Sequence, residues 1–389
     1  MKALFWISVG LIIYTYFLYP VLLLIVSSLK QLVSGRSHPS HSEDRSDACE
    51  NLPEVSVVIA AYNEESCIAE RIQNLQDLDY PAEKLSIWIG SDGSTDTTPD
   101  ILSSYQSPNL NVRLFNENRG KMSVLNDLIN EIVDDVLVMT DANTHFEADA
   151  IRCLARHFED EKIGAVCGEL NLIRGNARGN SDSIYWRYER VLKLHESRLG
   201  ALLGANGAIY AIRRSLFRPL PADTIVDDFQ IVMNVAKAGF RIHYDPKARA
   251  VEEIAPDLVA EKGRRVRIGA GNYQALCRQI WLLNPFLGWR FIAYFSHKVC
   301  RWFVPHLLLI ALATNIVLVG QGPYFLLLLC QIVFYALAGR GIRRLRNGET
   351  VNNIESILAF FVSMNLALFH GFMRYLSTES HGSWQRTAR

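Results

Sequence analysis

The chain has 389 residues, with 40 basic and 40 acidic side chains and a hydrophobic content of 49%. This length fits one large domain with accessory segments, or two ordinary domains. Balanced charge gives no bulk attraction to a polyanion, so we expect no nucleic acid as a partner. The seven cysteines are scattered without a C-x-x-C pair, which argues against a zinc site or a disulfide framework.

The uncharged stretch at residues 3–29 is long enough to span a bilayer with some tilt. A cleaved signal peptide is the alternative. Its apolar core is ordinarily only ~7–15 residues long and is followed by a small-residue cleavage site. We therefore predict a transmembrane helix over residues 1–30. The polar, Ser-rich and Asp-rich residues 31–53 are then a linker to a folded domain.

From residue 54 onward, short apolar runs alternate with amphipathic segments. Strands are predicted at VSVVIAA (55–61), LSIWIGSDG (85–93), NVRLFNE (111–117) and DVLVMTD (135–141). Helices are predicted at residues 65–78, 95–106 and 121–133. This β-α-β order with short connections predicts an α/β fold with a doubly wound, mostly parallel sheet. Ligands of such sheets bind beyond the carboxyl ends of the strands.

Polar side chains gather where these four strands end. In chain order they are Tyr62, Asn63, Glu64 and Glu65, then Asp92, Ser94 and Asp96, then Asn118, Arg119 and Lys121, then Asp141 and Asn143. Each group alone is explained by a turn or a helix cap. Together at one edge they predict a ligand site. Because neither a G-x-G-x-x-G motif nor a P-loop is present, we expect a nucleotide held by side-chain carboxylates on its base and ribose.

Six stretches, in this order, resemble the membrane-bound family 2 glycosyltransferases with a GT-A fold, in the branch of the cellulose, hyaluronan and poly-N-acetylglucosamine synthases. They are VSVVIAAYNEE, GSDGSTDTT, NRGKMSVLN, TDANTHF, GANGAIYAIRRSLF and VDDFQIVMNVAKAGFRIHYDPKA. The resemblance covers roughly residues 54–275. It implies an inverting, metal-dependent glycosyltransferase that takes a nucleotide-sugar donor, expected to be UDP-linked, and a glycan or lipid-linked acceptor.

The resemblance also implies roles for single residues. Asp228 matches the family's catalytic base and Asp227 its acidic neighbour; the alternative is two acids favoured by a helix N-terminus. Asp141 and Asn143 match the D-x-D motif, which holds Mg²⁺ or Mn²⁺ on the donor diphosphate. Because the amide of Asn143 carries no charge, we expect weak metal binding without donor. The expected nucleotide-sugar contacts are Tyr62, Asn63, Glu64, Asp92, Lys121, Asp141, Gly204, Gly207, Arg264 and Arg267.

The family's Q-x-x-R-W motif is altered in this chain. Arg264 stands in place of Gln and Ile268 in place of Trp, whereas Arg267 is kept and suits a diphosphate. In the processive family members that Trp lies near the acceptor sugar. The departure keeps two alternatives open. One is a single-sugar transferase acting on a polyprenyl-linked acceptor, and the other is a catalytically inactive membrane scaffold that binds a nucleotide.

The C-terminal part is apolar again. Residues 277–300 mix aromatic and basic side chains and predict an interfacial helix region, with a core helix as the alternative. Uncharged runs at 302–320 and 323–339 predict a transmembrane hairpin. Residues 354–376 carry Asn365, His370 and Arg374 among apolar side chains and predict a helix that either spans the bilayer or lies at its interface. A transporter would require ionisable residues along several spans, which these mostly apolar segments lack.

The predicted organisation is therefore a GT-A domain at residues 54–276, transmembrane helices within 301–376 and a tail at 377–389. Basic residues follow the first helix and the third apolar run, which places both points in the cytoplasm. We expect a multi-pass protein of the inner or plasma membrane with a cytoplasmic catalytic domain. Its expected partners are the donor, the acceptor, the lipid bilayer and other polysaccharide-assembly proteins.

Overall fold

The computed structural model describes residues 1–33, 52–173, 184–253 and 258–377. These residues divide into two compact units, which we describe separately. The sheet unit contains residues 23–253 of the described ranges. The helical unit contains residues 1–22 and 258–377.

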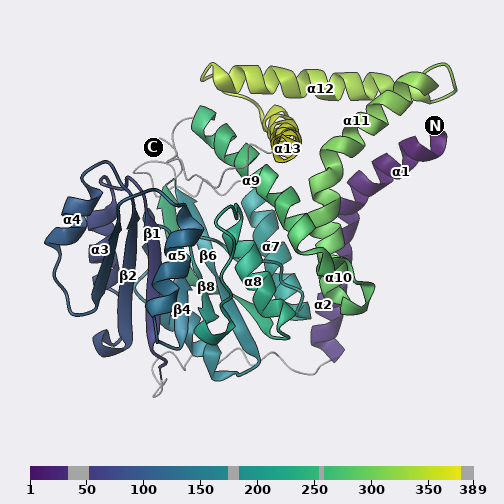
Figure 1. The fold of residues 1–389 in the computed structure, drawn as a ribbon. Coiled ribbons are helices and arrows are strands. Elements are labelled where there is room, and N and C mark those ends of the chain that lie inside the picture. Colours follow the sequence, from purple (N-terminus) through teal and green to yellow (C-terminus); the bar gives the residue numbers. More distant parts are fainter. Residues whose placement is uncertain (34–51, 174–183, 254–257, 378–389) are drawn as a thin grey trace. The chain divides into compact units, whose positions relative to one another are not determined.

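The sheet unit is built on eight strands, counted over its described residues, in the order β3-β2-β1-β4-β7-β6-β8-β5 (Figure 1). The strands are β1 (Val55–Ala61), β2 (Leu85–Asp92), β3 (Leu110–Phe115), β4 (Val136–Met139), β5 (Thr144–Phe146), β6 (Ile163–Ile173), β7 (Tyr210–Arg213) and β8 (Arg241–Glu253). The first four neighbours in this order are parallel, as are β6 and β8, whereas β7 is antiparallel to both β4 and β6. The predicted mostly parallel α/β sheet is confirmed.

Helices cover both faces of this sheet. They are α3 (Ile68–Gln76), α4 (Thr98–Ser104), α5 (Lys121–Glu131), α6 (Ala150–Ala155), α7 (Ile184–Leu199) and α8 (Asp227–Lys237). On one face, Ile59 of β1 belongs to the same buried cluster as Ile72 of α3. On the other, α5 approaches so closely that a Cβ on Gly90 would lie 2.4 Å from a methyl of Val124. Every residue of β1 is buried for this reason, as its unbroken apolar run predicts.

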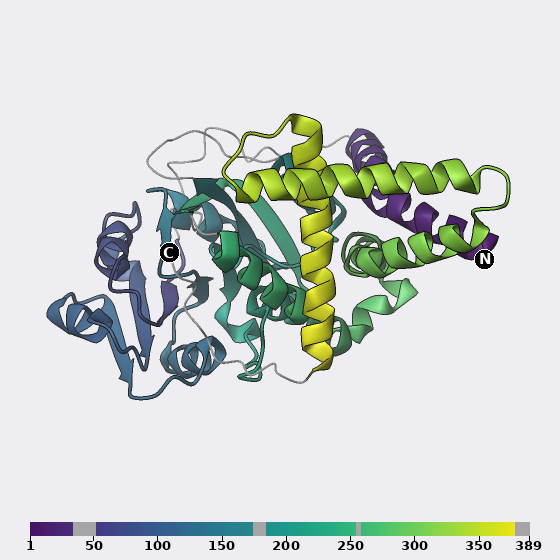
Figure 2. The same ribbon diagram turned by 90° about the horizontal axis from the view of Figure 1, so that it is seen from above.

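The helical unit contains the long apolar helices. Its elements are α1 (Lys2–Ile13), α9 (Leu258–Arg278), α10 (Trp289–Ala293), α11 (Cys300–Leu318), α12 (Tyr324–Arg346) and α13 (Asn353–Leu376). Helix α1 continues through a π-helical turn into α2 (Tyr19–Val33), of which residues 23–33 belong to the sheet unit. Figure 2 shows α13 crossing α12. A Cβ on Gly371 of α13 would lie 2.6 Å from the backbone carbon of Gly269, so α9 and α13 meet backbone to backbone.

Four stretches within the described residues are long and apolar enough to cross a membrane. They are Lys2–Val33, Trp289–Leu318, Tyr324–Arg346 and Asn353–Leu376. Together they indicate a membrane protein. The segment at 354–376, predicted either to span or to lie at the interface, meets the length and composition of a span.

The stretch at 277–300, predicted as one interfacial helix region, is divided into several pieces. After α9 come two 3-10 turns, Ile280–Leu283 and Pro285–Leu287, and then α10 begins after Gly288. Asn284 accepts a hydrogen bond from the backbone nitrogen of Phe286, and Gly288 has a φ of 58°. An asparagine cap, a proline and a left-handed glycine stop a continuous helix here. The last residues of the stretch continue through a π-helical turn into α11.

Candidate active site

The loop after β1 is tied to the loop after β2 through Asn63. This residue has a φ of 55°, a conformation that asparagine tolerates better than most residues. Its side-chain oxygen accepts a hydrogen bond from the backbone nitrogen of Thr95 at 2.8 Å, and its own backbone nitrogen donates to Ser94 Oγ at 3.1 Å. The contact of Asn63 with the donor stays a prediction. The two hydrogen bonds of Asn63 hold the loop after β1 against the loop after β2.

Glu64 belongs to the same pair of loops. Its side chain is buried, its backbone nitrogen donates to Thr98 Oγ1 at 2.8 Å, and its carboxylate accepts a bond from Cys67 Sγ at 3.2 Å. Tyr62, next to it, is partly buried. Both residues lie at the carboxyl end of β1, where the sequence predicts nucleoside contacts; those contacts stay predictions.

Asp92, the last residue of β2, ties the second loop to the third. Its side chain is fully buried, and its two carboxylate oxygens accept hydrogen bonds from the backbone nitrogens of Arg119 at 2.8 Å and Gly120 at 2.9 Å. Gly120 has a φ of 90°, which a side chain would strain. Asp92 therefore shapes the loop that presents Lys121. Its predicted contact with the nucleoside stays a prediction.

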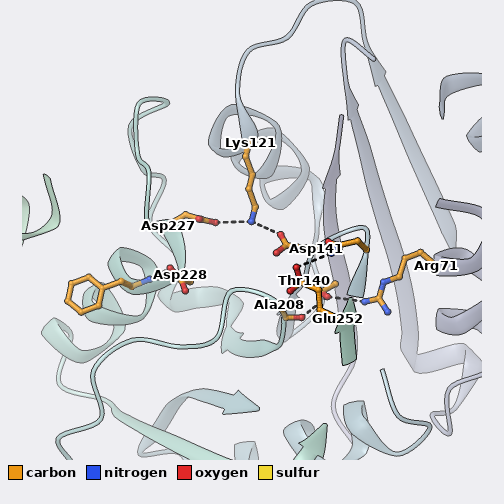
Figure 3. Close-up of polar contacts among 10 residues, drawn as sticks. Arg71, Lys121, Thr140, Asp141, Ala208, Asp227, Asp228 and Glu252 are labelled. Carbon is orange, nitrogen blue, oxygen red and sulfur yellow. Dashed lines mark hydrogen bonds and ion pairs between the residues drawn. The ribbon is translucent and has the colours of Figure 1, made fainter. Parts of the chain in front are cut away.

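Lys121, the first residue of α5, connects two carboxylates from distant parts of the chain. Its Nζ lies 2.8 Å from Asp141 Oδ1 and 3.4 Å from Asp227 Oδ2 (Figure 3). Burial alone would lower the pKa of Lys121, but the charges of Asp141 and Asp227 outweigh burial and raise this pKa above its ordinary value. The side chain is therefore an ammonium ion, and it joins the loop after β4 to the start of α8.

Asp228 follows Asp227 at the start of α8 and has a different environment. Burial and the neighbouring charge of Asp227 raise the pKa of Asp228 to about 6. One of its oxygens, Oδ1, accepts a hydrogen bond from the backbone nitrogen of Phe229 at 2.8 Å. A Cβ on Gly207 would lie 3.4 Å from the other oxygen, Oδ2, so the glycine leaves room beside this atom. A carboxylate with this pKa can accept a proton near neutral pH.

Gly204 is the other glycine predicted to contact the nucleotide sugar. The structure explains why this position requires glycine. Its φ is 80°, and a Cβ added there would lie 3.0 Å from a ring carbon of Phe229. A left-handed residue so close to an aromatic ring must be glycine. Gly204 thereby lets the loop before β7 pass over the first turn of α8. Its predicted contact with the sugar stays a prediction.

Asp141 and Asn143 carry the predicted metal site. Asn143 donates from its amide nitrogen to Glu252 Oε1 at 3.0 Å, an orientation that keeps the amide oxygen for a ligand. Glu252 is buried near the end of β8. Within the described residues, no group of three or more His, Cys, Asp or Glu side chains is arranged to hold a metal. The residues present fit a hard cation that takes its remaining oxygen ligands from a bound diphosphate.

Sequence reasoning missed Arg71, a fully buried cation behind the loop that contains Asp141. Its Nη2 donates to Thr140 Oγ1 at 2.9 Å (Figure 3). Its guanidinium lies 4.3 Å from the centre of the Phe146 ring. Burial lowers the pKa of Arg71 to about 9, while the charge of Asp141 opposes this shift. One signal was available, because Arg71 stands beside Ile72 on the apolar face of a predicted helix.

Sequence reasoning also missed Glu252 and Tyr210. Tyr210 begins β7 and pairs with Met139 at the end of β4, and its side chain is almost fully buried. Burial raises the pKa of Tyr210, as do the charges of Asp227, Asp228 and Asp141. Glu252 lies outside the six stretches that resemble the family, whereas Tyr210 lies within GANGAIYAIRRSLF, where only the two glycines were predicted to contact the donor.

Arg264 and Arg267, predicted to contact the diphosphate, lie on α9 in the helical unit. Both are partly buried. The neighbouring Arg265 has its guanidinium 5.4 Å from the centre of the Phe360 ring of α13. Their part in the site stays a prediction.

Residues 56–219 match the sequence model of Glycosyl transferase family 2. A "Probable glycosyltransferase YdaM" of Bacillus subtilis is 28% identical over 285 residues, which cover 70% of this chain and 66% of that protein. The Beta-monoglucosyldiacylglycerol synthase of Synechocystis is 27% identical over 269 residues, which cover 65% of this chain and 55% of that protein. The Poly-beta-1,6-N-acetyl-D-glucosamine synthase of Staphylococcus aureus is 27% identical, covering 60% and 58%. The chain thus spans less than two thirds of each relative's length.

A solved structure resembles the whole chain. The mannosyltransferase PcManGT of Pyrobaculum calidifontis, in complex with GDP-Man and Mn²⁺, aligns with a TM-score of 0.70. The alignment covers 97% of this chain and 99% of that one, at 20% identity. At this identity the likeness establishes a shared fold.

Proposed function

Because the chain belongs to glycosyl transferase family 2, we propose that it is an inverting enzyme that transfers a sugar from a nucleotide-sugar donor to an acceptor hydroxyl at the inner membrane face. The observation that carries this proposal is the environment of Asp228. Its pKa is raised to about 6, and Gly207 leaves room beside its Oδ2. A base in this position suits a reaction in which a hydroxyl must lose its proton as it attacks.

The proposed reaction is a single displacement. Asp228 accepts the proton of the acceptor hydroxyl while the hydroxyl oxygen forms a bond to the anomeric carbon. The bond from that carbon to the diphosphate breaks, and the nucleoside diphosphate leaves with the electron pair. Attack from the face opposite the leaving group inverts the anomeric configuration. Asp227 lies 3.4 Å from the ammonium of Lys121, and its charge contributes to the raised pKa of Asp228.

We propose that Asp141 and the amide oxygen of Asn143 hold Mg²⁺ or Mn²⁺. When bound, the cation supplies positive charge that stabilises the departing diphosphate. A single carboxylate in the D-x-D match means that metal affinity depends strongly on the donor phosphates. The Mn²⁺ bound with GDP-Man in the mannosyltransferase structure supports a divalent cation as the cofactor.

We infer a UDP-linked donor from the resemblance of the sequence motifs. We infer a glycan acceptor in cell-surface polysaccharide synthesis, which the similarity to a polysaccharide synthase supports. A single transfer to a lipid-linked acceptor is the second candidate. It is supported by Ile268 at the place of the motif Trp and by the similarity to a glycolipid synthase. A screen of UDP- and GDP-sugars with Mg²⁺ or Mn²⁺ identifies the donor, and product mass separates one added sugar from many.

Replacement of the base tests the proposed reaction. Asp228→Asn keeps an oxygen that can accept the Phe229 hydrogen bond but cannot take a proton, so turnover should fall roughly 10²–10⁴-fold with donor affinity retained. Nucleoside diphosphate release measures turnover, and calorimetry with the donor measures affinity. The matched control is Asp127→Asn. Asp127 is an exposed acid on α5 that pairs with Arg119, and its replacement should leave activity unchanged. Undiminished turnover of Asp228→Asn would exclude it as the base.

The inactive-scaffold alternative has its own outcome in the same assay. A scaffold binds a nucleotide but releases no diphosphate from any donor, with or without Mg²⁺ or Mn²⁺. Release that depends on Asp228 therefore separates the enzyme from the scaffold.

A further inference from the structure

The ammonium group of Lys121 lies against the carboxylate that the proposed function gives to the metal. Its Nζ is 2.8 Å from Asp141 Oδ1, and Asp227 Oδ2 lies 3.4 Å away on its other side (Figure 3). The Lys121 side chain is 23% exposed and that of Asp141 is 35% exposed, so solvent and ligands reach both. Without donor, Asp141 therefore already has a cationic partner.

The backbone and the side chain of Lys121 are held in different ways. Its backbone follows Gly120, whose nitrogen is bound to the buried Asp92, so the start of α5 is fixed. The ammonium, in contrast, is carried on a flexible four-carbon stem. It can leave Asp141 and keep Asp227 without any movement of the helix.

An ammonium and a divalent cation cannot share the same carboxylate without repulsion. Competition for Asp141 is stronger here than in a site with several acids. Asn143 supplies a neutral amide where the D-x-D motif has its second carboxylate, so the motif offers a cation only one carboxylate. The described residues also bring no group of three ligating side chains to the site. A cation arriving without donor must therefore displace Lys121 from the one carboxylate of the motif.

We propose that Lys121 competes with the divalent cation for Asp141 and so makes metal binding depend on the donor. The donor's diphosphate offers anionic oxygens to which an ammonium can bind, and its arrival frees Asp141 for the cation. The inference rests on the proposed function, since it takes Asp141 as a metal ligand. It gives Lys121 a role as a positioning residue that controls the order in which ligands bind.

The test is a measurement of metal affinity without donor. Mn²⁺ is titrated into the purified full-length chain in detergent, and free Mn²⁺ is followed by electron paramagnetic resonance. Lys121→Met removes the charge and keeps most of the apolar stem. We expect it to lower the Kd for Mn²⁺ by about tenfold or more relative to the wild type. Lys121→Gln, a second neutral variant, should change the Kd in the same direction.

A matched control separates competition from a change in net charge. Arg119 lies two residues earlier, pairs with Asp127 at 2.6 Å, and is 40% exposed. Arg119→Gln removes the same unit charge two residues before Lys121 and should change the Kd for Mn²⁺ by less than about twofold. Adding Asp141→Asn to Lys121→Met should remove the gain in affinity, because the gain acts through this carboxylate.

Saturating UDP or GDP supplies the diphosphate for the second arm. Either nucleotide should strengthen Mn²⁺ binding more in the wild type than in Lys121→Met, where no ammonium has to be moved. If both neutral variants bind Mn²⁺ no more tightly than the wild type, while binding still depends on Asp141, the competition is overturned and the proposed function stands. If Asp141→Asn leaves Mn²⁺ binding unchanged with both nucleotides, the metal assignment of the proposed function falls, and the inference falls with it.

Discussion

Two adjacent acids at the start of α8 have different environments, although both carry the same side chain. Asp227 is paired with Lys121 at 3.4 Å. Asp228 accepts a backbone hydrogen bond from Phe229 and has a pKa of about 6, raised by burial and by the charge of Asp227. One acid is therefore held in an ion pair, and the other has a pKa suited to accepting a proton. Two neighbouring acids with such different environments can have different roles in one reaction.

The raised pKa of Asp228 predicts how activity and stability depend on pH. Activity should fall as pH drops through about 6, because the base becomes protonated. Stability should change in the opposite sense. Between about pH 4 and pH 6 the folded donor-free protein binds the Asp228 proton and the unfolded chain does not, so this residue lowers stability as pH rises through that window.

Asp228→Asn removes the loss of stability that comes from ionising Asp228 in the folded protein, because an amide does not ionise. In the donor-free protein at pH 7.5 we expect the variant to be more stable than the wild type by roughly 1–3 kcal/mol, and the difference should vanish below about pH 4. Thermal melts of both proteins across this pH range measure the difference. A variant that is less stable than the wild type at pH 7.5 would contradict the raised pKa.

Residues in contact within the site differ in how far the sequence could predict them. Lys121 and Asp141 could be placed at one edge of the sheet because each follows a predicted strand, whereas Asp227 and Asp228 were indicated by the family motif that they match. Glu252 could not, because it meets Asn143 from a strand 109 residues away and no motif contains it. A contact of that kind depends on the register of β5 against β8, where Thr144 lies opposite Glu252.

At the scale of elements, the loop before β7 and the start of α8 meet through two glycines. The same substitution should have different effects at the two positions. Gly204→Ala places a side chain at a φ of 80° and 3.0 Å from Phe229, which should cost about 1 kcal/mol or more of stability. Gly207→Ala makes only ordinary contacts and should fold normally.

Gly207→Ala should nevertheless reduce activity, because its methyl would lie 3.4 Å from Asp228 Oδ2, where we propose that the acceptor hydroxyl approaches. We expect kcat/KM to fall roughly 10–100-fold with the melting temperature unchanged. Melting curves and steady-state kinetics of both variants are the measurement. Full activity in Gly207→Ala would show that the acceptor does not use this side of Asp228.

Helices and strands could largely be predicted from the sequence where an apolar pattern was long and uninterrupted. The strand at 55–61 is predicted to the residue, because both its faces are covered and its apolar run has no interruption. The stretch at 277–300 could not be predicted as separate pieces. Its aromatic and basic residues have the composition of an interfacial helix, and only the local sequence around Asn284 and Gly288 breaks it.

For the whole molecule, the distribution of charge relative to the four apolar stretches sets an expected orientation. The loop between α11 and α12 carries no charged side chain, whereas α12 ends in four arginines. Basic residues flanking spans favour the cytoplasmic side. We therefore propose that the α11–α12 loop faces outward, that the α12–α13 loop faces the cytoplasm, and that the sheet unit, which follows the first span, is also cytoplasmic.

Cysteine labelling on intact cells tests this orientation. Gly320→Cys lies in the α11–α12 loop, where an added Cβ meets nothing within 4 Å, and a membrane-impermeant maleimide should label it from outside. Asn347→Cys, at the end of α12, is the matched variant in the neighbouring loop and should react only after the cells are permeabilised. The wild type, which retains exposed Cys277 and Cys330, sets the background. The reverse labelling pattern would place the sheet unit outside the cell, away from cytoplasmic nucleotide sugars, and would contradict the proposed site of transfer.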